Sequence, residues 1–129
     1  MNTLKNPYAL IKSLKPTLND GVYVFCTVNK IPEIDISQVL CTFKEKEGTT
    51  LILRKDIADR TGLSYTYVAA WITITIQSSL DSVGLTAVMA EALANKGISC
   101  NVVAGYHHDH LFVHKDRADE AMKILNRLS

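Results

Sequence analysis

The sequence lacks an excess of charge of either sign. Its 129 residues include 14 basic and 13 acidic ones, which give a formal net charge of +1. A nucleic-acid-binding protein needs surplus lysine and arginine to neutralise phosphates, so we expect no nucleic-acid partner. Cysteines are also few: Cys26, Cys41 and Cys100 are odd in number and far apart. This spacing does not fit a disulfide framework or a zinc site. It predicts buried thiols in a reducing cytoplasm.

Long apolar runs are missing as well. No segment approaches the roughly 18 apolar residues of a membrane span, and residues 1–14 lack the unbroken apolar stretch of a signal peptide. We therefore expect a cytoplasmic protein that is neither exported nor inserted in a membrane. Neither G-x-G-x-x-G nor G-x-x-x-x-G-K-[ST] occurs, so no nucleotide-binding loop and no cofactor is expected. The 47% hydrophobic and 21% charged residues are typical of a chain with a packed core.

The first half of the sequence predicts short elements. They are a helix at 4–14, strands at 21–28, 39–44 and 49–53, and a helix at 55–61. Pro16 is expected to end the first helix. The alternation of β-branched and aromatic residues at 21–28 predicts a strand buried on both faces. Residues 29–37 are expected to form a loop.

The second half is more regular. The predicted elements are strands at 71–77, 98–104 and 111–114, a helix at 83–96, and a last helix that begins at the N-cap Asp116. The order is strand, helix, strand, strand, helix. A ferredoxin-like unit has one more strand after its second helix. We expect the N-terminal half, or another chain, to supply it.

The turn before the helix at 83–96 is a candidate anion site. It is rich in serine and threonine, and a helix start presents backbone N–H groups and the positive end of the helix dipole. The alternative is simple capping, in which Ser82 or Asp81 accepts from those same N–H groups.

All four histidines gather near the C-terminus, around Asp109. They are His107, His108, His110 and His114. Alternation along a strand places only part of this set on one side, so we predict a polar turn and no metal site. A metal-dependent hydrolase using the cluster is the weaker alternative. A nucleophilic pair of Cys100 with a histidine is conceivable, but nothing in the sequence brings the two groups together.

Residues 71–113 closely resemble an ACT domain. The resemblance lies in Leu80-Asp81-Ser82-Val83-Gly84-Leu85-Thr86, Gly97-Ile98-Ser99-Cys100-Asn101-Val102-Val103-Ala104-Gly105 and Asp109-His110-Leu111-Phe112-Val113. The whole chain resembles small bacterial proteins with two ACT-like units, and residues 43–51 resemble their N-terminal unit. The resemblance implies an α+β fold of two ferredoxin-like (ACT-type) βαββαβ units, duplicated and interlocked. We expect them at 1–66 and 67–129.

The resemblance also implies a function. ACT units bind amino acids where their first loop meets a neighbouring unit, and they pair through sheets or helices. This implies a non-catalytic regulatory or sensor protein, a homodimer, that binds a small metabolite, expected to be an amino acid. Gly84 would let the backbone approach the ligand, Asn101 would contact it, and Asp81 resembles the acidic residue that often precedes the glycine.

The candidate ligand-binding residues are Ser79, Asp81, Ser82, Val83, Gly84, Leu85, Thr86, Asn101, Val102 and Asp109. In this arrangement the ligand carboxylate accepts from N–H groups at the helix start, and its ammonium group meets Asp81, Asp109 or the Asn101 carbonyl. A second interpretation belongs to a different class: a dimeric assembly module that has no ligand.

Overall fold

Two compact units make up the chain in the computed structural model, which describes residues 7–78 and 80–129. One unit is Gly21–Ala69, here called the inserted unit. The other, here called the split unit, joins residues up to Asp20 with Ala70–Ser129. Residues 7–20, expected within the unit 1–66, thus group with the C-terminal part of the chain. The interlocked arrangement that the resemblance implied is confirmed, since one unit interrupts the sequence of the other.

The inserted unit contains three strands and one helix. They are β2 (Tyr23–Val28), β3 (Val39–Lys44), β4 (Thr49–Arg54) and α2 (Lys55–Arg60). The strands are antiparallel in the order β3-β4-β2, and β2 also pairs with the start of β5 (Val68–Thr75). The short helix η2 (Ile36–Gln38) stands where a full ferredoxin-like unit has its first helix.

The core of the inserted unit lies on one face of its strands. It consists of Val24, Cys26, Leu51, Leu53, Ile57 and Ala58. The expectation that residues 21–28 are buried on both faces holds only in part. On the second face Tyr23 is buried, but Phe25 is half-buried and Thr27 is exposed. The hairpin at 39–54 and the helix after it are confirmed.

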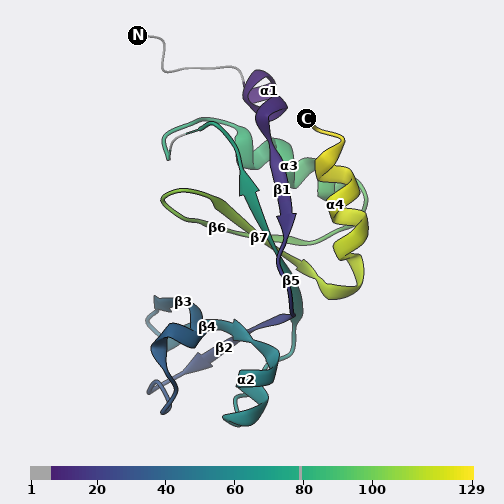
Figure 1. Ribbon diagram of the computed structural model, residues 1–129. Coiled ribbons are helices and arrows are strands. Elements are labelled where there is room, and N and C mark those ends of the chain that lie inside the picture. The colour runs from purple at the N-terminus through teal and green to yellow at the C-terminus, as the bar shows by residue number, and fades with distance from the viewer. Residues whose placement is uncertain (1–6, 79) are drawn as a thin grey trace. The chain divides into compact units, whose positions relative to one another are not determined.

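The split unit holds the remaining elements (Figure 1). They are α1 (Pro7–Leu10), η1 (Ile11–Ser13), β1 (Lys15–Leu18), the later part of β5, α3 (Leu85–Ala94), β6 (Cys100–Ala104), β7 (Asp109–His114), η3 (Lys115–Arg117) and α4 (Ala118–Asn126). The strand order is β1-β5-β7-β6. Alternate residues of β5 and β7, namely Ala70, Ile72, Ile74, Leu111 and Val113, share one core with α3 and α4. Both helices therefore cover the same face of the sheet.

Strand β1 supplies the edge that the second unit lacked in the sequence. It pairs antiparallel with β5, from Lys15 opposite Thr75 to Leu18 opposite Ile72. Sequence reasoning missed this strand because Pro16 indicated only the end of a helix. Proline lacks an N–H donor and is tolerated on an edge strand, whose outer side has no partner. Sheet completion within the chain is confirmed.

Two helix starts differ from expectation. Arg117, and not Asp116, precedes α4, and the backbone N–H of Asp116 donates to Nδ1 of His114 at 3.1 Å. Helix α3 begins at Leu85, and its buried side chains Leu85, Met89 and Leu93 follow the predicted spacing. Among the described helices, none combines the length and the apolar content needed to cross a bilayer.

Candidate functional site

A cleft of about 100 Å³ lies in the split unit, between the turn that precedes α3 and the hairpin that joins β6 to β7. We call it the turn–hairpin cleft. It is lined by Ser78, Leu80, Ser82, Leu85, Thr86, Ala104, Gly105, Tyr106, His107, His108 and Asp109. The fold thus brings together the serine-rich turn and the histidine-rich turn, the two polar segments that the sequence indicated separately.

Four of the predicted ligand-binding residues line this cleft: Ser82, Leu85, Thr86 and Asp109. Five others are not among its lining residues: Asp81, Val83, Gly84, Asn101 and Val102. Ser79 lies outside the described residues. Asn101 pairs with Phe112 and lies three residues before Ala104, a separation of about 10 Å along a strand. The hairpin contributes Gly105, Tyr106, His107 and His108, which sequence reasoning did not assign to the ligand.

The start of α3 presents backbone donors to the cleft. Gly84 holds the N-cap position with φ 91°, so neither Ser82 nor Asp81 occupies it. The first intrahelical bond runs from the N–H of Val88 to the carbonyl of Gly84 at 3.0 Å. The preceding N–H groups of the first turn, including those of Leu85 and Thr86, have no acceptor within the helix.

Gly84 lies against α1. A Cβ atom added to Gly84 would be 3.1 Å from Cγ of Pro7 and 3.4 Å from its Cβ. Glycine is therefore required at position 84 for two reasons. It leaves space for the Pro7 ring, and it adopts a positive φ without strain. The sequence did not predict this contact with Pro7. It indicated only that the Gly84 backbone approaches a ligand.

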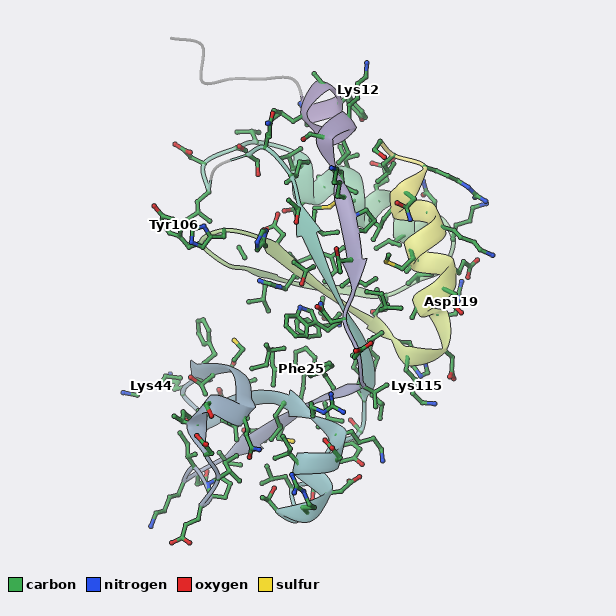
Figure 2. The ribbon with its side chains drawn as sticks, in the orientation of Figure 1. Lys12, Phe25, Lys44, Tyr106, Lys115 and Asp119 are labelled. Atoms are coloured by element: carbon green, nitrogen blue, oxygen red, sulfur yellow. The ribbon has the colours of Figure 1, made fainter. Side chains whose placement is uncertain are left out.

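The cleft carries both signs of charge. Asp109 provides a carboxylate, while the first turn of α3 provides the positive end of a helix dipole. Hydroxyl groups of Ser78, Ser82 and Thr86 add donors and acceptors. At the tip of the hairpin, Tyr106 projects outward with 85% of its surface exposed (Figure 2). Such a cleft suits a small molecule with one anionic and one cationic group.

The histidines do not act as one group. His107 and His108 are exposed in the turn before β7, which is the predicted polar turn. Within residues 7–78 and 80–129, no three histidine, cysteine or carboxylate side chains are arranged to hold a metal ion. His110 follows in β7. Its ring centroid is 6.4 Å from that of His108, and its Nδ1 accepts a hydrogen bond from Nε1 of Trp71 at 3.0 Å.

The pair of Trp71 and His110 is a feature that sequence reasoning missed. An indole N–H only donates, so Nδ1 of His110 must be unprotonated and the neutral ring carries its proton on Nε2. Burial lowers the pKa of His110, and nearby His108 lowers it further, while Asp109 opposes the shift. A Cβ added to Gly105, in the cleft wall, would be 3.2 Å from Nε2 of His110. The His110 ring therefore lies beside Gly105 in the hairpin.

This pair predicts acid sensitivity. Because the folded state lowers the pKa of His110, the unfolded chain binds the proton more readily, so stability is lost as the pH falls below about 6.5. Below the folded-state pKa the loss is complete. We expect His110→Gln, whose amide oxygen can still accept from Trp71, to reduce this slope in denaturant unfolding followed by Trp71 fluorescence. An unchanged slope in the variant would contradict the assignment.

Cys26 and Cys100 are poor nucleophiles. Burial raises the pKa of Cys100 to about 11 and also raises that of Cys26. Cys100 is opposite Val113 in the β6–β7 pairing, while His110 is opposite Val103. A Cys100–histidine nucleophile is therefore disfavoured, since the thiolate form is scarce at neutral pH. The expectation of buried thiols holds for Cys26 only, because Cys41 and Cys100 are half-buried.

Models of known protein families match both parts of the chain. Residues 5–70 match one model of the ACT domain and residues 67–127 match another. The chain belongs to the ACT domain family. The mixed α/β architecture, with antiparallel strand pairs in each unit, is that of an ACT regulatory domain. No curated protein sequence matches the chain.

Solved structures give the same fold to this ACT protein. A Vibrio cholerae protein of unknown function, described as a possible transport protein, is 43% identical over 94% of both chains, with a TM-score of 0.85. An Agrobacterium tumefaciens protein is 18% identical, covering 89% of this chain and 88% of its own, with a TM-score of 0.69. The ligand-free regulatory subunit of Thermus thermophilus aspartate kinase is 11% identical, covering 88% and 95%, with a TM-score of 0.62. The last two comparisons show the fold alone.

Proposed function

We propose that this ACT protein is a non-catalytic regulator that binds a free amino acid in the turn–hairpin cleft. Membership of the ACT domain family gives the chain a regulatory role with small-ligand binding. The amino acid, its position and the absence of catalysis are the proposed specifics. The observation that carries them is the meeting of a helix start and the Asp109 carboxylate on one small cleft.

The α-carboxylate of the ligand is placed at the start of α3. There it accepts hydrogen bonds from the N–H groups of Leu85 and Thr86, which have no acceptor within the helix. The hydroxyl groups of Ser82 and Thr86 line the same part of the cleft. A carboxylate gains about 0.3–1 kcal/mol from an exposed helix dipole, and charge-assisted hydrogen bonds add to this.

The α-ammonium group of the ligand is placed at Asp109. This residue begins β7 and faces the turn from the hairpin side of the cleft. Because the two ends of the cleft favour opposite charges, a zwitterion is oriented, whereas a simple carboxylic acid or amine uses only half of the site. At about 100 Å³ the cleft holds the charged groups of an amino acid, and selectivity among side chains then depends on the exposed rim.

A homodimer is part of the proposal. Two exposed apolar side chains line the turn–hairpin cleft: Leu80 is 68% exposed and Tyr106 is 85% exposed. Val83, which follows Ser82 in the same turn, is 66% exposed. Exposed apolar side chains grouped around a polar cleft are typical of an interaction surface. A second copy that covers this rim would bury these side chains and close the cleft over its ligand, which couples binding to assembly.

The decisive experiment is a thermal-shift screen with all proteinogenic amino acids, followed by calorimetry. A ligand that binds only the native state raises the melting temperature, and light scattering of the same samples is expected to show a dimer. Asp109→Asn should weaken the affinity roughly ten- to a hundredfold, because a hydrogen bond to a charged group contributes about 1.5–3 kcal/mol. Asp119→Asn, an exposed carboxylate in the first turn of α4 (Figure 2), is the matched control and should bind normally.

Other outcomes are informative. If no amino acid raises the melting temperature while the protein is dimeric, the assembly module without a ligand is favoured. If an amino acid binds equally well to Asp109→Asn, the ligand lies elsewhere. A strict monomer at high concentration would contradict the homodimer.

A further inference from the structure

A second cavity lies in the split unit, between the turn that follows α3 and the exposed side of α4. Its volume is about 280 Å³, and it is lined by Lys96, Glu120, Lys123, Ile124 and Arg127. Ile124 belongs to the hydrophobic core and is 8% exposed, whereas the four charged residues are exposed. We call this cavity the basic cleft, because three of its five lining residues are cations.

The single carboxylate of the basic cleft is already engaged. Oε1 of Glu120 accepts from Nε of Arg117 at 2.8 Å and from Nη2 of Arg117 at 2.5 Å. The same guanidinium donates to the carbonyl oxygens of Lys96, at 2.9 Å, and of Gly97, at 3.4 Å. Arg117 therefore neutralises Glu120 and also holds the turn with Lys96 against the start of α4.

The three cations that remain have no counter-charge. Among the residues that the structure describes, Lys96, Lys123 and Arg127 form no ion pair with a carboxylate within 4.0 Å. Lys123 and Arg127 are four positions apart on one side of α4, where like charges repel. The whole chain has a formal net charge of only +1, so this cluster does not follow from an excess of basic residues.

We propose that the basic cleft binds a small multivalent oxyanion, a phosphate-bearing or tricarboxylate metabolite. Arginine presents a planar fork that matches two oxygens of such a group, and lysine adds compact charge and rotatable donors. A multivalent anion relieves the repulsion among three cations, which a single carboxylate does only in part. The basic cleft and the turn–hairpin cleft share no lining residue. The ACT protein would therefore bind a second class of ligand at a separate site.

Helix dipoles alone also favour cations here. Lys96 follows the end of α3, and Lys123 and Arg127 lie at the end of α4, where the negative end of each dipole attracts positive charge. This interaction with the helix dipoles needs no ligand, and by itself it predicts no saturable binding of added anions. The cleft that the three cations line gives an oxyanion a place to bind, and saturable binding separates this proposal from charges that only complete two helix ends.

The test is an NMR titration of ¹⁵N-labelled full-length protein at constant ionic strength. Inorganic phosphate and citrate are added separately, with sodium chloride as the reference. We expect saturable shifts at the amides of Lys96 and Gly97 and at the C-terminal end of α4. Saturation with phosphate alone identifies a phosphate-bearing ligand, saturation with citrate alone identifies a tricarboxylate, and saturation with both supports the shared oxyanion chemistry.

Two double variants carry the same change of charge. Lys123→Gln with Arg127→Gln should weaken oxyanion binding roughly tenfold or more, since two charge-assisted contacts are lost. Lys44→Gln with Lys46→Gln, on the exposed hairpin of the inserted unit, should leave it unchanged. Non-saturating shifts, or equal affinity in both double variants, would overturn the proposal. Asp109→Asn should retain oxyanion binding, which keeps this result separate from that of the turn–hairpin cleft.

Discussion

Removal of residues 1–20 is expected to abolish cooperative folding of the split unit. Strand β1 pairs with β5 over four positions, and Ile11 and Leu14 before it are 4% and 2% exposed in the core. Burial of two such side chains contributes about 3–6 kcal/mol, which is comparable with the whole stability of a small domain, about 5–15 kcal/mol. The test is denaturant unfolding of the truncated chain, followed by Trp71 fluorescence and by circular dichroism. We expect neither signal to show a cooperative transition.

A circular permutant is the control for this truncation. The chain would start at Gly21, and residues 7–20 would follow Ser129 through a short glycine-serine linker. Helix α4 contacts β1, and Leu10 at the end of α1 and Leu128 after α4 both pack against one hydrophobic core, so the linker has little to span. Because β1 takes the place of the last strand of a βαββαβ unit, we expect the permutant to unfold cooperatively. A truncated chain with the transition midpoint of the full chain would contradict this account.

Much of the fold could be predicted because local patterns and tertiary packing agree. The stripe of Leu85, Met89 and Leu93 specifies the same buried face in the sequence and in the structure. Strand β1 could not be predicted, since it has four residues with Pro16 among them and its sheet position depends on pairing with β5, more than 50 residues away. Local propensity carries no information on such a partner.

The candidate site was predictable in part for a related reason. The turn before α3 was recognised from its composition, and Asp109 as a carboxylate that complements the ammonium group of a ligand. The hairpin residues Tyr106 and His108 were not, because their place beside that turn depends on the order of β5, β7 and β6 in the sheet. The basic cleft could not be predicted from the sequence either. Lys96 and Lys123 line one cleft only because α3 and α4 pack on the same face of the sheet.

Replacement of Gly84 by valine is expected to weaken amino-acid binding at least about tenfold. A branched side chain at φ 91° is strained by about 1–2 kcal/mol, and its Cβ would lie 3.1 Å from the ring of Pro7. Relief of that contact moves α1 or the start of α3, and overpacking of this kind typically adds about 1–3 kcal/mol. Calorimetry should show at least about a tenfold loss of affinity, since the N–H groups of Leu85 and Thr86 no longer aim at the ligand carboxylate.

Gly97 offers a matched control for this substitution. It also has a positive φ, 71°, but an added Cβ meets nothing within 4 Å. Gly97→Val therefore carries the backbone strain without the collision, and we expect it to be the more stable variant in denaturant unfolding and to bind the amino acid normally. Equal stability of the two variants would show that the contact with Pro7 is not limiting. Equal affinity, with both variants folded, would place the ligand away from the start of α3, because only Gly84→Val displaces those N–H groups.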